Sequence, residues 1–209
     1  MIFSSKHSFY FFGCIYDRAI EPLLNNTKNR VAKYISEHNL SPALDICCGT
    51  GRQCSLICKN QQQTLGLDLD LNMMIYSASN YPHIPFICAN SSHVPIKDSY
   101  FKCIIISYAL HEKPQELRSK MIEEARQLLA PDGKIILIDF EQPWNILSHV
   151  GKFFIFSIER MAGGEHFRNW RQFLKQGGLM AFIKQQELVE IERYHVEMAS
   201  SSILVAKFA

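Results

Sequence analysis

The chain has 209 residues, a formal net charge of +2 and 47% hydrophobic residues, values typical of one ordinary globular domain. Its 22 basic residues are scattered along the chain, whereas a nucleic-acid-binding protein needs a concentrated basic face. No stretch approaches the roughly 20 apolar residues of a membrane span, and the aromatic run at residues 9–16 lacks a signal-peptide cleavage site. We therefore expect a cytoplasmic protein without a nucleic-acid partner or a membrane span.

Seven cysteines are present, an odd number, and no two of them form a Cys-x-x-Cys pair. Most of them fall inside predicted strands or helices, which is typical of buried, reduced thiols. We expect free cysteines and no metal site. A zinc or disulfide framework is the alternative.

The first part of the chain alternates between the two kinds of secondary structure. Apolar residues at helical spacing predict a helix over about residues 18–38, within an N-terminal helical cap at 1–40. Short buried strands are predicted at 43–47, 63–68, 84–88, 103–107 and 134–140, with helices at 52–60, 71–80 and 115–129 between them. Strands that alternate with helices at this pitch predict a parallel sheet.

The last part of the chain has a different pattern. Residues 188–198 and 202–208 are both predicted strands, and only three residues separate them. They must form an antiparallel hairpin, because a parallel return needs a longer crossover. We therefore predict one α/β domain over residues 1–209. Its core is a doubly wound sheet of seven strands, mostly parallel with a C-terminal antiparallel hairpin, and helices cover both faces.

A glycine-rich turn follows the first predicted strand, in the sequence LDICCGTG at residues 44–51. Gly49 and Gly51 have no side chains to hold a ligand away from the backbone, and Asp45 supplies a negative charge. This segment resembles the first motif of the class I S-adenosylmethionine-dependent methyltransferases, which have a Rossmann-like fold. The resemblance implies that Asp45 lies near the ammonium group of the cofactor. Cys47 lines the same turn, although the family often has Gly or Ala there.

A second acidic residue, Asp68, ends the next predicted strand. Its carboxylate can accept hydrogen bonds from the two vicinal ribose hydroxyls, as in both nicotinamide-binding and methyltransferase folds. We expect Asp68 and the adjacent Leu69 to contact the cofactor. An isolated Asp at a strand end is more often a helix cap, but here we assign that role to Asp70.

Two later segments extend the resemblance. Residues 88–95 are similar to the third motif of the family, which implies that Asn90 and Ser91 face the adenine amino group. A plain Asx turn is an equal alternative for Asn90. Residues 107–112 resemble the segment beneath the bound cofactor, which implies a contact from Ser107.

The resemblance covers residues 16–140. Within it, residues 126–134 resemble the turn before the fifth strand of the family, where we expect Gly133 to adopt a positive φ. Residues 138–143 are similar to the ubiquinone and menaquinone biosynthesis C-methyltransferases and their small-molecule relatives.

The candidates for a general base or a substrate anchor are Tyr16, Tyr108, His111, Glu165 and His166, and we assign a catalytic role to His111 and Tyr16. His111 follows the fourth strand at the catalytic edge of the sheet, and an imidazole titrates in the range that suits proton transfer. Tyr16 lies just ahead of the first predicted helix, where the family often closes over the cofactor. The alternatives are that His111 only orders its loop and that Tyr16 is only a packed aromatic residue.

The segment at 144–182 is too long for a simple crossover helix, and we expect it to be a helical insertion over the acceptor site. Its first half is rich in apolar residues, and glycines at 163–164 then interrupt it. After the glycines, His166 and Arg168 are expected to contact the acceptor. Alternatively, the aromatic residues complete the core or form a dimer face or a membrane-surface contact.

These features predict S-adenosylmethionine-dependent methyl transfer to a small, partly apolar acceptor by in-line displacement. One alternative is an NAD(P)-dependent oxidoreductase. It is disfavoured because the nicotinamide fingerprint requires glycine at the position of Cys54. Another is a protein that binds S-adenosylmethionine without catalysis.

Overall fold

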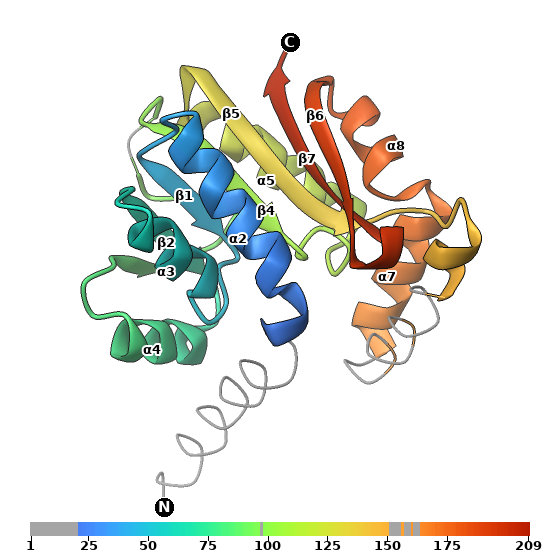
Figure 1. Cartoon of the computed structure of the whole chain (residues 1–209), viewed down its shortest axis with the longest axis horizontal. Helices are drawn as coiled ribbons and strands as arrows, with labels where there is room; N and C mark the ends of the chain where they lie inside the picture. The colour runs from blue at the N-terminus through green and yellow to red at the C-terminus, as the bar shows by residue number, and fades with distance from the viewer. Residues whose placement is uncertain (1–20, 97, 151–155, 157–159, 161–163) are drawn as a thin grey trace, which may run out of the picture.

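The computed structural model describes residues 21–96, 98–150, 156, 160 and 164–209. Its centre is one seven-stranded sheet with the order β3-β2-β1-β4-β5-β7-β6 (Figure 1). The strands are β1 (Ala43–Ile46), β2 (Thr64–Asp68), β3 (Phe86–Cys88), β4 (Phe101–Ser107), β5 (Leu129–Phe140), β6 (Leu188–Val196) and β7 (Ser201–Phe208). The first five pair in parallel, and β7 runs antiparallel between β5 and β6. The predicted fold class is confirmed.

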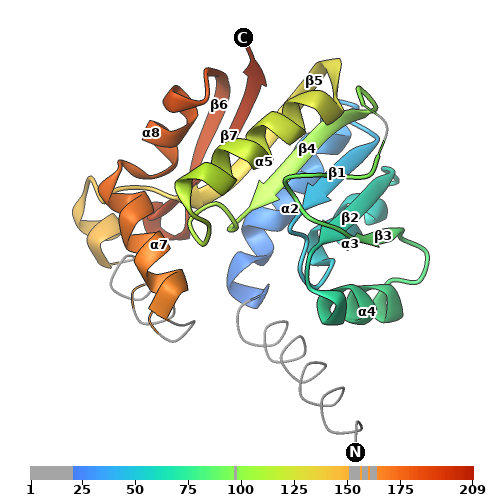
Figure 2. The same ribbon diagram turned by 180° about the vertical axis from the view of Figure 1, so that it is seen from behind.

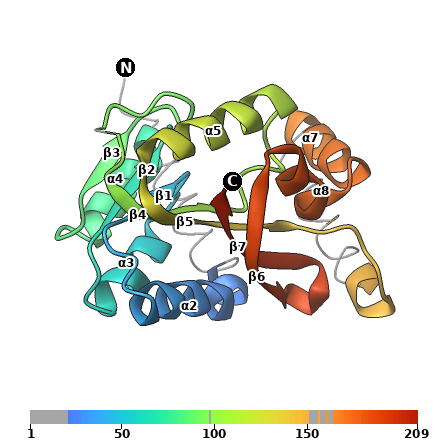
Figure 3. The same ribbon diagram turned by 90° about the horizontal axis from the view of Figure 1, so that it is seen from above.

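Helices cover both faces of this sheet. They are α2 (Glu21–Glu37), α3 (Arg52–Lys59), α4 (Leu71–Asn80), α5 (Gln115–Leu128), α7 (Gly164–Lys175) and α8 (Gly178–Gln185). Seen from above, α2 and α3 lie on one side of the sheet and α5 on the other (Figure 3). The view from behind shows α7 and α8 beyond α5, next to the closing hairpin (Figure 2). Both helical layers therefore depend on the central strands for their apolar contacts.

The central strand β4 shows why the sheet is buried on both faces. Ile104 and Ile106 belong to the apolar cluster that includes the inner sides of α5 and α8. Cys103 and Ile105 alternate with them and pack in the opposite cluster, against α2 and α3. Successive side chains of a strand point to opposite faces, so an uninterrupted apolar run suits a strand covered on both sides.

Several strands differ in their bounds from the prediction, among them β3 and β5. β3 begins at Phe86, because the preceding Pro85 has no N–H to donate to the ladder. β5 begins earlier than predicted, at Leu129, and its pairing with β4 shifts register before Lys134.

The expected positive φ at Gly133 is wrong, since Gly133 is absent from the residues with positive φ. A Cβ atom there would lie only 2.6 Å from Cγ of Leu129. The glycine is therefore required for close packing within the irregular start of β5, and not for a left-handed turn.

Several expectations fall partly outside the described residues. Only the part of the N-terminal cap from Glu21 onward is described, so Tyr16 lies outside it, as does most of 151–163. β6 and β7 form the predicted antiparallel hairpin, joined by the 3-10 helix η1 (Glu197–Ala199). Among the described helices, none has the length and apolar character needed to cross a bilayer.

The described cysteines are free thiols: Cys47, Cys48, Cys54, Cys58, Cys88 and Cys103. The seventh, Cys14, lies outside the described residues. Burial raises the pKa of the Cys47 thiol to about 12, so this thiol keeps its proton at neutral pH.

Candidate cofactor and acceptor site

A cavity of about 710 Å³ opens at the carboxyl ends of β1, β2 and β4. This volume lies within the roughly 300–1,000 Å³ range of ligand pockets. Eight of the nine residues predicted to contact the cofactor line it: Asp45, Cys47, Gly49, Asp68, Leu69, Asn90, Ser91 and Ser107. These residues meet because the carboxyl ends of parallel strands lie at one edge of the sheet.

The glycine-rich turn contributes bare backbone to the cavity wall. Gly49 has a φ of 52°, and a Cβ atom added to it would meet nothing within 4 Å. That empty space is where a ligand can approach the backbone. Gly51 is the exception among the predicted contacts, because it is absent from the cavity lining. A Cβ atom there would lie 2.7 Å from the ring of Phe86, so Gly51 serves the packing of α3 against β3.

Asp68 faces this turn from the end of β2. Its Oδ2 atom accepts the N–H of Gly49 at 2.9 Å, and its Oδ1 atom accepts the N–H of Asp70 at 3.0 Å. A carboxylate has about four acceptor sites, so each oxygen retains capacity for a hydroxyl donor. The two backbone bonds fix the orientation of the carboxylate beside the open space at Gly49. Asp70 caps α4, as predicted, by accepting the N–H groups of Asn72 and Met73.

Asp45 lies deeper, where only 1% of its surface is exposed. Burial raises the pKa of this carboxyl to about 7, and the nearby ammonium of Lys28 partly opposes the shift. The thiol of Cys54 donates to Oδ2 of Asp45 at 3.6 Å. This buried carboxyl therefore changes its charge near neutral pH.

Helix α2 adds a cluster of polar groups that the sequence analysis did not predict. Glu21, Leu24 and Lys28 line the cavity, and their spacing of three and then four residues places them on one helical face. The Lys28 ammonium lies 2.5 Å from Oε1 of Glu21, and both side chains are largely buried. The other oxygen of Glu21, Oε2, is buried and finds no hydrogen-bond partner among the described residues. The three-and-four spacing of these residues is the sequence signal that predicts a shared face on α2.

Contacts to the η1 turn hold α2 in place over the cavity. The hydroxyls of Thr27, from α2, and Tyr108, which follows β4, both donate to the carboxylate of Glu197. Burial raises the pKa of Tyr108 well above its usual value, so the phenol keeps its proton. Through Glu197, these bonds connect Tyr108, which lines the cavity, to α2.

The predicted adenine contact has a local partner. The amide oxygen of Asn90 accepts the N–H of Ser92 at 3.0 Å and its hydroxyl at 2.9 Å. This is the Asx turn that the sequence left as an alternative. Asn90 and Ser91 nevertheless both line the cavity.

His111 occupies a buried position beside the cavity. Its Nδ1 atom lies 2.7 Å from Oδ1 of Asp139, at the end of β5. The backbone N–H groups of Leu110 and His111 both donate to Oδ2 of the same carboxylate, at 3.0 and 3.1 Å. Asp139 therefore fixes both the loop and the imidazole ring. No role for Asp139 was predicted from the sequence.

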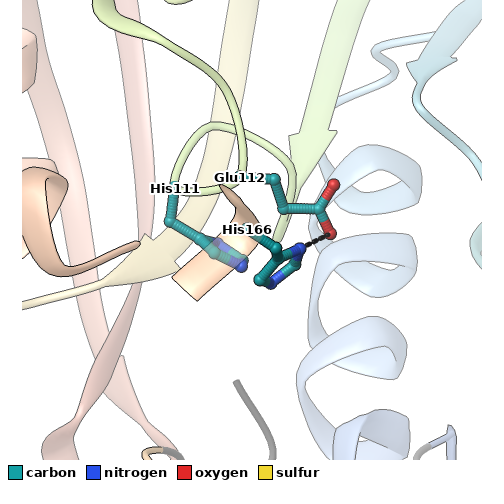
Figure 4. Close-up of side chains that lie close together, drawn as sticks. All are labelled: His111, Glu112 and His166. Atoms are coloured by element: carbon teal, nitrogen blue, oxygen red, sulfur yellow. Dashed lines mark ion pairs between the residues drawn. The ribbon is translucent and has the colours of Figure 1, made fainter. Parts of the chain in front are cut away.

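The two predicted residues of α7 lie differently. His166 points towards the loop after β4: its Nδ1 atom is 3.9 Å from Oε1 of Glu112, and its ring centroid is 5.4 Å from that of His111 (Figure 4). Arg168 is exposed, and none of His111, His166 and Arg168 is in the cavity lining. The structure brings His166 and His111 together and leaves Arg168 outside this group.

Comparison with known proteins accounts for this arrangement. Residues 43–133, which include the glycine-rich turn and Asp68, match the family model described as a methyltransferase domain. This match covers less than half of the chain, and it agrees with the resemblance of the glycine-rich turn and Asp68 to the class I S-adenosylmethionine-dependent methyltransferases. Two findings disfavour the nicotinamide alternative: the match to a methyltransferase domain and the antiparallel hairpin at the sheet edge.

The most similar curated relatives include quinone methyltransferases. The chain is 33% identical over 110 residues to a 2-phytyl-1,4-naphtoquinone methyltransferase of Thermosynechococcus vestitus, covering 48% of this chain and 47% of that one. It is 25% identical over 131 residues to a ubiquinone/menaquinone biosynthesis C-methyltransferase of Haemophilus ducreyi, covering 58% and 50%. The chain thus spans about half the length of the curated relatives it matches.

Solved structures extend the likeness to the whole fold. Magnesium protoporphyrin IX methyltransferase from Synechocystis superposes with a TM-score of 0.69 at 16% identity, covering 99% of this chain and 96% of that one. An N-methyltransferase of Bradyrhizobium japonicum gives 0.62 at 12% identity, covering 87% and 85%. At these identities the likeness shows the fold alone.

Proposed function

We propose that this protein transfers a methyl group from S-adenosylmethionine to a small, partly apolar acceptor. The observation that carries the proposal is the cavity at the carboxyl edge, which joins the polar groups around Asp68 to the aromatic and polar groups after β4. Bound S-adenosylmethionine would supply the methyl group on a sulfonium that leaves as a neutral thioether. The main task of the protein would be to align the acceptor for in-line displacement and to exclude water.

The residues present fit this cofactor. Asp68 can accept the ribose hydroxyls, and the empty space at Gly49 admits the chain between sugar and amino acid. The amino-acid end of the cofactor carries one positive and one negative charge. Lys28 can form an ion pair with the carboxylate of the cofactor. Asp45 and Oε2 of Glu21, which has no hydrogen-bond partner among the described residues, can accept hydrogen bonds from its ammonium.

The acceptor would bind at the other end of the cavity, under the segment 144–182. Tyr108 and Leu117 line this end with apolar surface, and Glu112 and Lys113 add charge. His111, which is buried next to the lining residue Glu112, would serve as a base or an anchor. The names of the relatives point to quinone rings with an apolar substituent, and we propose an acceptor of this kind.

The first experiment tests the cofactor end. Asp68→Ala removes a charged acceptor of buried hydroxyls, and each such bond is worth about 1.5–3 kcal/mol. The affinity for S-adenosylhomocysteine, measured by calorimetry, should fall at least tenfold. Asp98→Ala is the matched control, since Asp98 is exposed and precedes β4 at the opposite edge of the sheet. Unchanged binding in Asp68→Ala would show that Asp68 does not hold the ribose.

The second experiment tests turnover. Labelled S-adenosylmethionine is incubated with the protein and a metabolite extract, and the label should appear in an organic-soluble product. Melting shifts with S-adenosylhomocysteine and with NADH are compared in parallel, and only the first should raise the melting temperature. Binding of S-adenosylhomocysteine without methyl transfer would favour the non-catalytic alternative.

A further inference from the structure

Three potential ligand groups gather beside the acceptor end of the cavity. His111 and Glu112 come from the loop after β4, and His166 comes from α7 (Figure 4). One nitrogen or oxygen atom from each lies within 4.8 Å of the others. Two imidazoles and one carboxylate form a donor set that divalent first-row transition metals bind in proteins.

The buried Asp139 gives the first of these ligands a defined tautomer. Its two oxygens accept backbone N–H groups of Leu110, His111 and Phe140, so the carboxylate acts as an acceptor and Nδ1 of His111 carries the proton. In the neutral imidazole, the lone pair is then on Nε2. Histidine ligands of metal ions usually donate their other ring N–H to a carboxylate or carbonyl in this way.

Glu112 and His166 have a separation that suits two ligands of one ion. Oε1 of Glu112 lies 3.9 Å from Nδ1 of His166, which is too long for a hydrogen bond. Two ligands at about 2.0–2.2 Å from a tetrahedral ion lie about 3.4 Å apart, so small side-chain rotations suffice. The other oxygen of Glu112 lies 3.3 Å from the ammonium of Lys113. That contact leaves Oε1 on the side of the histidines.

The two elements that carry these groups are fixed to each other. Arg118 donates to the carbonyl oxygen of Leu110 at 2.8 Å and to that of Asn169, on α7, at 3.2 Å. The amide of Asn169 donates in turn to the carbonyl oxygen of Glu112 at 2.7 Å. Arg118 is itself 99% buried, since only 1% of it is exposed. Such a scaffold holds the ligands near their binding geometry, which a metal site requires.

We propose that His111, Glu112 and His166 bind one divalent first-row transition-metal ion, such as Zn²⁺. Three protein ligands leave a fourth position open for a water or a ligand oxygen. Glu112 also lines the cavity, so this position is next to the acceptor end. The side chains of His166 and Glu112 are 23% and 35% exposed, which provides a route for the ion. With the ion bound, His111 acts as a ligand, and the ion provides the anchor for the acceptor.

This inference goes beyond methyl transfer, and its test uses neither cofactor nor acceptor. The full chain is freed of metal with a chelator and titrated with Co²⁺ alone, followed by visible absorption, and Zn²⁺ is then added as a competitor. We expect one Co²⁺ per chain, displaced by Zn²⁺. His111→Ala, Glu112→Gln and His166→Ala should each weaken binding at least tenfold. His83→Ala is the matched control, because His83 is exposed and precedes β3 at the opposite edge of the sheet.

Asp139→Asn keeps all three ligands but changes the partner of His111. It should weaken Co²⁺ binding by about 10–100-fold, as loss of a ligand's hydrogen-bonded carboxylate typically does. Any one of three results would overturn the proposal. They are no saturable Co²⁺ binding, Co²⁺ binding by the three ligand variants that is as tight as that of the wild type, and a cobalt spectrum dominated by thiolate charge transfer. Binding of S-adenosylhomocysteine is measured on the same variants. Its retention would separate a failed metal site from a failed cofactor site.

Discussion

The cofactor end and the acceptor end of the cavity are built in different ways. At the cofactor end, Asp45 lies in β1, Gly49 follows that strand and Asp68 ends β2, and the order of the strands brings them together. At the acceptor end, Asp139 from β5 holds His111, and His166 arrives from a helix far along the chain. The strand-end residues of the first region depend on local turns, whereas the second region depends on contacts between distant segments.

The two regions should respond differently to substitution, one mainly in ligand binding and the other also in stability. Asp68 is only partly buried and makes contacts with two nearby backbone groups. Asp139 is fully buried and accepts four N–H groups. The Asp139 carboxylate therefore stabilises the fold as well as orienting a residue of the site.

The largest effect is expected from Asp139→Ala. This change leaves several buried donors without an acceptor, which should lower the free energy of unfolding by about 3–5 kcal/mol. Chemical denaturation measures it, with the exposed Asp132→Ala as control. Asp68→Ala should cost clearly less stability. If Asp139→Ala unfolded at the same denaturant concentration as the wild type, the acceptor end would not depend on this network.

Lys28→Met should act on the cofactor end alone. It keeps much of the buried stem but removes the charge that we pair with the cofactor carboxylate, a loss of about 1.5–3 kcal/mol. The affinity for S-adenosylhomocysteine should fall at least tenfold by calorimetry. Lys33→Met, on the same helix with a side chain that is 74% exposed, should bind normally. Equal affinities in the two variants would remove Lys28 from the site.

The pH dependence of binding tests Asp45. Its pKa of about 7 means that the carboxyl is mostly protonated at pH 6 and mostly ionised at pH 8. Only the ionised form attracts the cofactor ammonium, so affinity for S-adenosylhomocysteine should rise up to about tenfold over this range. Asp45→Asn should abolish the rise. A wild-type affinity that stays constant from pH 6 to 8 would contradict the pairing.

The same group has the opposite effect on the stability of the cofactor-free protein. Its folded-state pKa of about 7 lies above the ordinary 3.8, so the protonated form favours folding. The stability that Asp45 contributes is present below pH 3.8 and is lost as the pH rises through 7. Thermal melts without ligand should show this loss in the wild type and not in Asp45→Asn.

The smallest effect distinguishes the two residues of α7 that the sequence placed at the acceptor. Arg168 is exposed and lies outside the cavity lining, so Arg168→Ala should change stability by less than about 0.5 kcal/mol and leave turnover intact. His166→Ala should impair turnover without weakening S-adenosylhomocysteine binding. Steady-state rates with an identified acceptor measure both. Full activity in His166→Ala would show that His166 does not contact the acceptor.

Local patterns in the sequence predicted the fold and brought most of the proposed cofactor residues to one cavity. Alternating strands and helices predicted the sheet, and the short link before β7 predicted its antiparallel edge. Eight of the nine predicted cofactor residues line the cavity. Gly51 differs because a glycine pattern does not tell whether a ligand or a neighbouring ring fills the space beside it, and here Phe86 does so.

The sequence by itself determined which side chains stand at the carboxyl ends of the strands, because strand period and turn chemistry are local properties. Three features follow from the tertiary structure alone. Glu21 and Lys28 line the cavity, Asp139 contacts the ring of His111, and His166 lies beside Glu112. Those pairings depend on how helices pack across the sheet edge. Helical spacing can place Glu21 and Lys28 on one face of a helix, but it does not show which edge of the sheet that face covers.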